Sequence, residues 1–335
     1  MLDALYNSKI VSTGSYTPEI VLTNQDLERI VDTSDDWIAK RTGIRERRIA
    51  KQGQFASDLA RIASEEALEM AGIDPEQIDL IVVGTVTPDR QFPSCACTLQ
   101  QKIGATNAAS MDVSAGCSGF IYALSVAHNA IRCGEAEHAL VVGTEVLSSV
   151  TNWSDRNSCV LLGDGAGAVI LRRTTEDTGI RSIHMRSDGG LGDLLYSVDE
   201  GAPRRGLYIG ERQNDTKPYY LVMDGNKLFK KAVRCLEDIA RITLERAKVT
   251  IEELALMVPH QANIRIINAV ARRLGISLEK VYITIQKYGN TSSSSIPIAL
   301  NEARKAGRLS PMDKLLMITF GAGLTWGACL VEWSL

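Results

Sequence analysis

The sequence predicts an α/β protein made of two similar halves, and three observations support this prediction. Short apolar runs, as expected of strands covered on both faces, alternate with stretches whose apolar residues recur at helical spacing. The helix, turn and strand pattern of residues 67–84 returns at 243–260, which is 176 positions later. The apolar runs around Leu140 and Leu316 are also 176 positions apart. A duplicated and fused α/β unit is the simplest explanation, and a chance likeness of two α/β patterns is the alternative.

The elements of the first half are matched by elements of the second. Four continuous apolar runs predict strands, at residues 78–84, 139–143, 255–258 and 315–320. Apolar residues three and four positions apart predict helices over residues 59–70 and 228–242. Further helical patterns follow Cys117 and Ser295, and these two helices occupy equivalent places in the two halves.

A glycine-rich segment closes each half, at residues 163–171 and 321–331, with an offset of 158 that implies loops of different length. The first segment, GDGAGA, superficially matches a dinucleotide-binding pattern. That pattern must open a helix, whereas the apolar AVIL that follows here predicts a strand. The sequence therefore argues against nicotinamide chemistry.

The join of the halves divides the chain into an N-terminal half over 1–175 and a C-terminal half over 176–335. Just after the join, residues 188–220 are rich in glycine, charge and turn-forming residues. They predict a long excursion within the second half. Excursions of this length often cover an active site.

Composition and charge exclude several classes of protein. The 335 residues carry 37 Lys and Arg against 40 Asp and Glu, so a formal charge of −3 leaves no basic field for nucleic acid. No apolar run reaches the roughly 18 residues of a membrane span, and the first residues lack a basic and then apolar leader. We expect a cytoplasmic protein that binds neither nucleic acid nor membrane.

The cysteines and histidines do not form a metal-binding pattern. Seven cysteines, an odd number scattered along the chain, predict reduced thiols. Cys95 and Cys97 lack a second pair at zinc spacing, and the four histidines are isolated from one another. We therefore expect no metal, and structural or surface roles for His128, His138 and His184.

Cys117 is the candidate nucleophile. It lies in DVSAGCSGF, where small residues precede a long helical pattern, so its sulfur is expected at a strand-to-helix elbow. Backbone N–H groups and the helix dipole at such an elbow are expected to lower the pKa of the thiol and favour the thiolate. A small buried cysteine that merely fills a tight turn is the alternative, and the fragment alone does not decide between them.

Two polar residues are candidates to assist the cysteine. His260 follows a predicted central strand in VPHQAN, at the carboxyl end where ligand sites of α/β sheets gather. Asn290, in YGNTSSSS, falls just before the position that the repeat makes equivalent to Cys117. A core or capping histidine and a helix-capping asparagine are the alternatives. The turn at 321–323 either offers N–H groups to an oxyanion or is simply tight.

With these fragments in this order, the chain resembles the β-ketoacyl-acyl-carrier-protein synthase III family of thiolase-like condensing enzymes over nearly its full length. Further matching pieces are DTSDDWI at 32–38, RTGIRER at 41–47, FPS at 92–94 and MDGN at 223–226. The resemblance implies a five-layered αβαβα fold from two similar halves, a homodimer, and a Cys117, His260 and Asn290 site. It implies condensation of a short acyl-CoA with malonyl-acyl-carrier protein, with acyl-CoA as substrate and no cofactor. Gly116 departs mildly from the family, where Ala is frequent before the nucleophile.

The resemblance also suggests roles for residues outside the three. It implies that backbone N–H groups of Cys117 and Ala322 hold the oxyanion. Trp37 and Arg156 would flank the CoA adenine, with Arg41 near the phosphates, and the further CoA-binding residues would be Thr33, Gly225, Phe229 and Asn263. Phe92 resembles the residue that the partner subunit places at the end of the acyl pocket. The acidic carrier protein would dock on an exposed stripe of Arg265, Arg272 and Arg273. Solvated surface residues are the alternative for these positions.

Two other functions remain open at this stage. One is a specialised relative that loads the same cysteine but uses another primer or acceptor, such as an alkylquinolone-type, polyketide-priming or acyltransferase enzyme. The other is a catalytically silent carrier-binding partner, which the presence of all three site residues argues against.

Overall fold

The computed structural model describes residues 6–199 and 219–335, which form two mixed β-sheets and two small antiparallel sheets of two strands each. The first sheet has the strand order β1-β7-β6-β4-β5. Its strands are β1 Asn7–Tyr16, β4 Leu80–Gly84, β5 Ala109–Val113, β6 His138–Val146 and β7 Asp164–Thr174. The second sheet has the order β11-β12-β13-β8. Its strands are β8 Gly179–Ser187, β11 Leu254–Pro259, β12 Lys314–Gly321 and β13 Thr325–Glu332.

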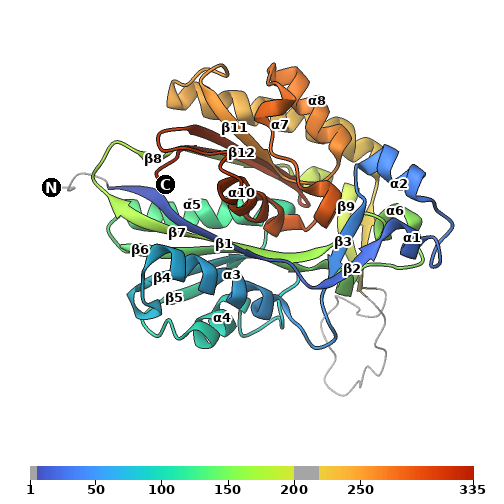
Figure 1. The fold of residues 1–335 in the computed structure, drawn as a ribbon, viewed down its shortest axis with the longest axis horizontal. Coiled ribbons are helices and arrows are strands. Elements are labelled where there is room, and N and C mark those ends of the chain that lie inside the picture. The colour runs from blue at the N-terminus through green and yellow to red at the C-terminus, as the bar shows by residue number, and fades with distance from the viewer. Residues whose placement is uncertain (1–5, 200–218) are drawn as a thin grey trace.

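The helices complete five layers, αβαβα, as Figure 1 shows. Between the sheets lie α5 Gly119–Arg132 and α10 Ser295–Lys305, whose apolar residues share one core with both sheets. The outer face of the first sheet is covered by α3 Ala56–Ala71 and α4 Cys95–Ile103. The outer face of the second is covered by α7 Gly225–Ala247 and α8 Ile264–Leu274. The predicted fold is confirmed.

The strand register supports the duplication at the level of residue pairs. Leu80 pairs with Ala139 in parallel, and Leu256 pairs with Leu315, each 176 positions after its counterpart. The offset of 158 for the glycine-rich segments is wrong. Ala139 pairs with Leu171 and Leu315 with Val331, so these strands are offset by 160, because ladder hydrogen bonds and not glycine spacing fix the register.

The two halves differ at the edge of the sheet. In the first half β4 pairs with β5 over five residues. In the second, the equivalent edge is reduced to one isolated bridge between Met257 and Val281. The predicted strands and helices are otherwise found within a few residues of their expected bounds, and GDGAGAVIL lies in strand β7, as expected.

Several short elements gather at one end of the molecule, at the right of Figure 1. They are β2 Ile20–Thr23, α1 Asn24–Leu27, α2 Asp35–Thr42, β3 Glu46–Ile49 and α6 Arg156–Cys159. Leu27, Ile38 and Cys159 form a separate small core with the partly buried Trp37 and Ile264. This packing ties α2 to the start of α8.

The excursion at 188–220 contains regular structure where it is described. A 3-10 helix over Gly189–Leu194 leads into β9 Leu195–Asp199, which pairs antiparallel with β10 Tyr219–Met223. The middle of the predicted excursion, residues 200–218, lies outside the described residues. The remaining short elements are 3-10 helices at Pro75–Gln77, Gly116–Ser118, Leu147–Val150, Leu278–Lys280 and Ser292–Ser294, and α9 Ile285–Tyr288. In the ranges 6–199 and 219–335, no helix is both long and apolar enough to cross a membrane.

Candidate active site

A largely apolar cavity of about 340 Å³ brings the three predicted site residues together. Cys117, His260 and Asn290 all line it, although they come from both halves of the chain. Ala322 of the β12 to β13 turn lines it as well. Leu195 and Leu221 of the β9 and β10 pair contribute to its wall, so the described part of the excursion does border the site.

Glycines allow two backbone segments to meet beside Cys117. The cysteine lies in the 3-10 helix Gly116–Ser118, directly before α5. Gly116 has φ +55, and a Cβ there would lie 2.6 Å from the Ala322 nitrogen. A Cβ on Gly321 would lie 2.5 Å from the Cys117 nitrogen. The bare glycines therefore bring the amides of Cys117 and Ala322 to one wall of the cavity, as an oxyanion site requires.

The pKa of Cys117 is raised and not lowered, which differs from the expectation from the elbow. Burial raises the pKa of Cys117 to about 11, and the charge of Glu145 adds to the rise. A hydrogen bond from Ser292 lowers the pKa, but by less than burial raises it. The helix dipole acts within one turn, whereas removal of the sulfur from water penalises the charged form directly.

His260 is a buried, neutral side chain whose ring is held by a hydrogen bond. Its Nδ1 lies 2.6 Å from the Ser295 hydroxyl oxygen, which also accepts the N–H of Gln261 at 3.3 Å. The contact fixes the orientation of the ring, and either Nδ1–H or the Ser295 hydroxyl can be its donor. Burial lowers the pKa of His260 to about 3, so the ring stays neutral at physiological pH.

Asn290 is fixed by its own backbone and by its neighbour. Its N–H donates to the Leu161 carbonyl at 2.8 Å, and its carbonyl accepts from the Gly163 N–H at 3.0 Å. The side-chain Oδ1 accepts the Ser292 N–H at 2.8 Å. The acceptor end of the amide is thereby occupied, and the NH₂ end is the one available to a ligand in the cavity.

The residues expected to bind CoA lie in two groups. Gly225, Phe229 and Asn263 line the cavity. The other four belong to the end cluster of α2 and α6 and do not line it: Thr33, Trp37, Arg41 and Arg156. The hydroxyl of Thr33 is buried with no hydrogen-bond partner among the described residues.

The stacking around Trp37 differs from the expected arrangement. The guanidinium groups of Arg41 and Arg156 both lie 4.7 Å from the ring centroid of Trp37. Arg156 thus packs directly on the ring, and no base fits between the two. Insertion of an adenine between Trp37 and Arg156 requires the arginine to move.

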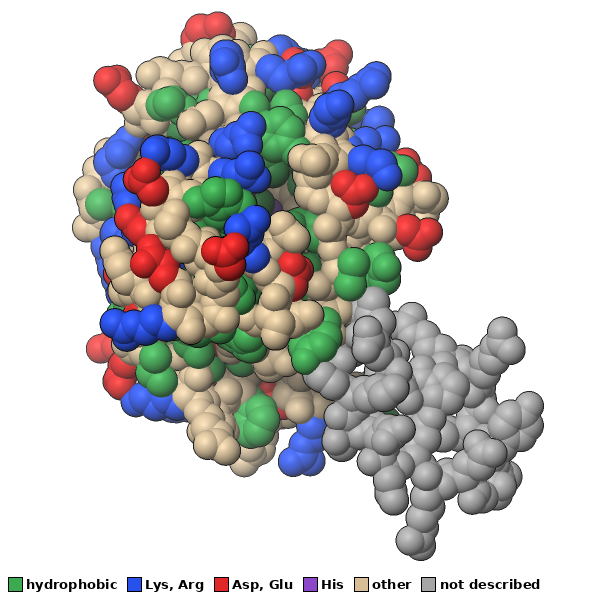
Figure 2. All heavy atoms as spheres, turned by 90° about the vertical axis from the view of Figure 1, so that its right-hand side faces the viewer, with side chains coloured by type: hydrophobic (Ala, Val, Ile, Leu, Met, Phe, Trp, Pro, Cys, Tyr) green, Lys and Arg blue, Asp and Glu red, His purple; other side chains and the backbone are tan. Residues whose placement is uncertain are grey.

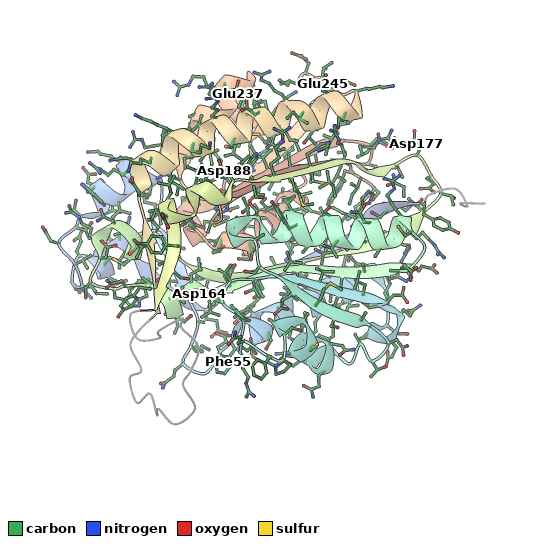
Figure 3. The ribbon with its side chains drawn as sticks, turned by 180° about the vertical axis from the view of Figure 1, so that it is seen from behind. Phe55, Asp164, Asp177, Asp188, Glu237 and Glu245 are labelled. Carbon is green, nitrogen blue, oxygen red and sulfur yellow. The ribbon has the colours of Figure 1, made fainter. Side chains whose placement is uncertain are left out.

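The three arginines of α8 are exposed but not equivalent. Arg273 pairs with Glu237 of α7, and Glu237 also pairs with Arg241. Figure 3 labels Glu237 in this outer layer of the molecule. Arg265 lies 5.7 Å over the ring of Phe229, a residue of the cavity wall. Arg272 has no ion pair among the described residues. Figure 2 shows several lysine and arginine side chains over the upper part of the corresponding end face, with aspartate and glutamate side chains among them.

Phe92 lies away from the cavity of its own chain. Its side chain is 80% exposed on the segment between β4 and α4, and it does not contribute to the lining. Such an exposed aromatic residue is available to a partner chain.

Sequence reasoning missed the residues that support the three. Ser295 orients His260, Ser292 orients Asn290, and the buried Glu145 bonds to Ser293 beside them. The serines stand in a SSSS run, where helix capping was the available interpretation. Glu145 follows an apolar strand, and nothing in its local sequence indicates that its carboxyl is buried.

A duplicated five-layered α/β fold with cysteine, histidine and asparagine on one cavity defines a thiolase-like condensing enzyme. The family described as 3-oxoacyl-[acyl-carrier-protein] synthase III matches residues 111–189, and its C-terminal family matches residues 244–333. Beta-ketoacyl-[acyl-carrier-protein] synthase III of Aquifex aeolicus is 48% identical over 97% of this chain and 99% of its own.

Solved structures agree with these matches. The crystal structure of the Aquifex aeolicus synthase has a TM-score of 0.89, 48% identity, and covers 97% of this chain and 100% of its own. The priming β-ketosynthase of the R1128 polyketide pathway has a TM-score of 0.91 at 35% identity and covers 100% of this chain and 98% of its own. This chain belongs to the β-ketoacyl-acyl-carrier-protein synthase III family and is a condensing acyltransferase of fatty acid biosynthesis.

Proposed function

We propose that this enzyme condenses a short acyl-CoA primer with malonyl-acyl-carrier protein and so initiates fatty acid synthesis. The observation that carries the proposal is the single cavity that Cys117, His260 and Asn290 line together. The expected cytoplasmic location and the absence of any metal or prosthetic group from the reaction are part of the proposal.

In the first half-reaction, the sulfur of Cys117 attacks the thioester carbonyl of acyl-CoA. The N–H groups of Cys117 and Ala322 stabilise the oxyanion that develops, and the bond to the CoA sulfur then breaks. CoA leaves with a proton and the acyl group remains on Cys117. The facing glycines Gly116 and Gly321 support this role because they let the two amides converge.

In the second half-reaction, malonyl-acyl-carrier protein loses CO₂ and its enolate attacks the acyl-cysteine. Nε2–H of His260 and the NH₂ group of Asn290 donate to the thioester oxygen as negative charge develops on it. The neutral, oriented ring of His260 supports this role, since its Nδ1 is already paired with Ser295. The product is a β-ketoacyl thioester on the carrier.

CoA and carrier binding extend the proposal to the surface. Gly225, Phe229 and Asn263 line the passage for the pantetheine chain, and Thr33, Trp37, Arg41 and Arg156 bind the nucleotide after Arg156 moves off Trp37. The Arg265 and Arg272 surface receives the acidic carrier. Two copies form a homodimer in which Phe92 of one closes the acyl pocket of the other, and this favours a short primer.

Intact-mass analysis after incubation with a panel of acyl-CoAs tests the proposal. A short primer is expected to add one acyl group to the enzyme, and malonyl-acyl-carrier protein is expected to remove it as a β-ketoacyl product. A size-exclusion measurement of the same sample tests the dimer. Failure of every short acyl-CoA to load the enzyme would contradict the proposed substrate.

A second function is supported by the likeness to the R1128 priming β-ketosynthase. A polyketide-priming enzyme would use the same cysteine but another primer or acceptor. The cavity of about 340 Å³ with its apolar lining is compatible with primers longer than acetyl. The same acyl-CoA panel separates the two functions by which chain length loads fastest and which carrier accepts it.

A further inference from the structure

Gln261 has a buried side-chain amide whose hydrogen-bonding positions are all occupied. The residue is 1% exposed. Its Nε2 donates to the carbonyl of Pro259 at 2.7 Å and to that of Tyr282 at 3.2 Å. Its Oε1 accepts the N–H of Thr284 at 2.9 Å and that of Ile285 at 3.2 Å. An exchange of the amide oxygen and nitrogen would break all four bonds, so the orientation of this side chain is fixed.

The four bonds join the end of β11 to the segment that leads to Asn290. Pro259 is the last residue of β11, and its peptide bond to His260 is held on both sides. The carbonyl of that peptide accepts from Gln261, and the N–H of His260 donates to the Ile318 carbonyl at 2.8 Å. The oxygen of the Gln261 amide holds the start of α9, and Asn290 lies two positions after the end of α9. Gln261 therefore connects the backbone of His260 to the segment of Asn290.

The duplication shows why a side chain makes this connection. In the first half, backbone pairing joins the ends of β4 and β5, Gly84 with Val113, and Thr85 donates its N–H to the Val113 carbonyl at 3.3 Å. Thr85 is the counterpart of Gln261, 176 positions earlier. The counterparts of β5 are residues 285–289, where the chain forms α9 and not a strand. N–H groups at the start of a helix have no partner within it, and the long amide side chain supplies their acceptor.

A second contact attaches the same segment beyond Asn290. Ser295 lies five positions after Asn290, and its hydroxyl oxygen is 2.6 Å from Nδ1 of His260. The same oxygen accepts the backbone N–H of Gln261 at 3.3 Å. The chain from α9 to Ser295 is thus attached to the end of β11 on both sides of Asn290. The side chain of Gln261 makes the attachment on the near side.

The spacing of His260 and Asn290 matters because the proposed condensation step needs both. Two donors stabilise one oxyanion only when each lies about 2.7–3.1 Å from it. A displacement of about 1 Å is enough to lose much of such an effect. His260 and Asn290 line the same cavity from separate segments. The bonds that hold the two segments together therefore affect whether both side chains reach one oxygen.

We propose that Gln261 is a positioning residue for condensation, whose side-chain amide sets the spacing between the His260 ring and the Asn290 amide. Gln261 is not among the described residues that line the cavity, so it acts through these two and not on the substrate. The amides of Cys117 and Ala322 belong to other segments, at the start of α5 and after β12. Acyl loading should therefore not depend on Gln261. The inference rests on the proposed roles of His260 and Asn290.

The test uses Gln261→Met and Gln261→Glu, each alone and combined with His260→Ala. Methionine has a similar length and removes all four bonds, whereas glutamate keeps acceptors for the N–H groups of Thr284 and Ile285. Gln286→Glu is the matched control, since Gln286 lies in the same segment and its side-chain oxygen has no partner among the described residues. Acyl loading and the condensation of preloaded enzyme with malonyl-acyl-carrier protein are measured separately, each in a single turnover.

Gln261→Met is expected to slow condensation by about 10²-fold, the usual size of a lost oxyanion donor, and Gln261→Glu by less. Both variants should load an acyl group at close to the wild-type rate, and Gln286→Glu should resemble the wild type in both steps. In the His260→Ala background, neither substitution of Gln261 should slow condensation further, because one of the two donors that it spaces is already absent.

A crystal structure of Gln261→Met tests the positioning independently of activity. Residues 282–290 should be displaced from the end of β11 by more than about 0.5 Å, the tolerance of a functional geometry. The amides of Cys117 and Ala322 should keep their places. An unmoved segment would overturn the inference, whatever the reaction. A wild-type enzyme that loads no acyl-CoA would instead refute the proposed function, and the displacement would still decide whether Gln261 sets the spacing.

Three kinetic results would also overturn the inference. Equal losses of acyl loading and condensation in Gln261→Met would indicate a general loss of structure. A loss that adds in full to that of His260→Ala would indicate an effect unrelated to the histidine. Condensation by Gln261→Met at the wild-type rate would show that the amide is not needed. If Gln261→Met does not fold, Gln261→Glu decides by the same measurements.

Discussion

The same strand-to-helix junction occurs once in each half of this chain. The two copies share a backbone conformation but carry different side chains. Gly116 and Ser292 are 176 positions apart and have φ values of +55 and +49. Each begins a 3-10 turn that leads into a central helix, α5 at Gly119 and α10 at Ser295. Cys117 follows in the first junction and Ser293 in the second. The duplicated backbone was kept while one copy became the nucleophile and the other its support.

The ends of the preceding strands differ in a complementary way. In the first half Gly84 and Gly119 pack backbone against backbone, since a Cβ on Gly84 would collide with Gly119. The equivalent residues of the second half are His260 and Ser295, which form a side-chain hydrogen bond. In the first half, two glycines let the helix pack closely on the strand end. In the second half, the same two positions hold a hydrogen-bonded pair of polar side chains. The site therefore needs both halves, and changes in each should affect different steps.

Replacement of the nucleophile should have the largest effect. Cys117→Ala is expected to abolish acyl loading from acyl-CoA, because Ser293 in the other junction is turned to Gly84 and Glu145 and not to the cavity. Intact mass after incubation with acyl-CoA measures this. Cys97→Ala, which removes an exposed thiol, is the control and should load normally. Acyl loading of Cys117→Ala at the wild-type rate would refute the assignment.

Loss of the second half's donors should separate the two half-reactions. His260→Ala or Asn290→Ala is expected to leave acyl loading largely intact and to slow condensation by about 10²-fold, the usual size of a lost oxyanion donor. Rapid mixing of the acylated variants with malonyl-carrier measures the second step alone. Equal losses in both steps would mean that these residues activate the cysteine instead.

Making the second junction resemble the first should have a smaller effect. Ser295→Ala removes the hydroxyl that orients His260, and we expect condensation to slow by about 10-fold while acyl loading persists, as for other residues that orient a functional histidine. The burial that lowers the pKa of His260 remains, so this ring should stay neutral and its titration should not enter the pH profile between pH 5 and 8. A new ionisation in that range would show that Ser295 controls the charge and not the tautomer.

The helices that follow β4 and β11 also differ. In α4 the single cation, Lys102, is tied to Asp58, whereas α8 presents Arg265 and Arg272. Reversal of both arginines to Glu is expected to raise KM for malonyl-carrier several-fold at low salt through slower association, with acylation by acyl-CoA unchanged. Arg61→Glu, on the opposite outer layer, is the control. If the double variant has an unchanged KM for malonyl-acyl-carrier protein at low salt, the carrier does not dock on Arg265 and Arg272.

The smallest effect is expected at the C-termini of α3 and α7. Gly72 ends α3 with φ +62, and its counterpart Lys248 ends α7 with φ +57. Lys248→Gly should raise the free energy of unfolding by about 0.5–1 kcal/mol, since a left-handed residue with a side chain is strained. Urea unfolding measures this, and activity should not change. Gly72→Ala should lower stability by a similar amount, and a loss of stability in Lys248→Gly would contradict the argument.

Much of the fold was predictable from local patterns. The apolar runs gave the central strands because a strand covered on both faces must be apolar at every position, and the 176-residue offset gave the second sheet from the first. The offset of 158 failed because strand register depends on pairing with a neighbour. Glycine positions alone do not determine that pairing.

By itself, the sequence determined the α/β class and the duplication, because these follow from periodicity and spacing along the chain. It singled out Cys117, His260 and Asn290 as candidates from their places at strand ends and elbows. Tertiary structure alone decided the protonation of the site. Burial between the two halves raises the pKa of Cys117, places the carboxyl of Glu145 out of water, and lowers the pKa of His260. It also decided that Arg273 pairs with Glu237 and that Arg156 stacks on Trp37. Desolvation and pairing depend on groups that are distant in sequence, so no local pattern encodes them.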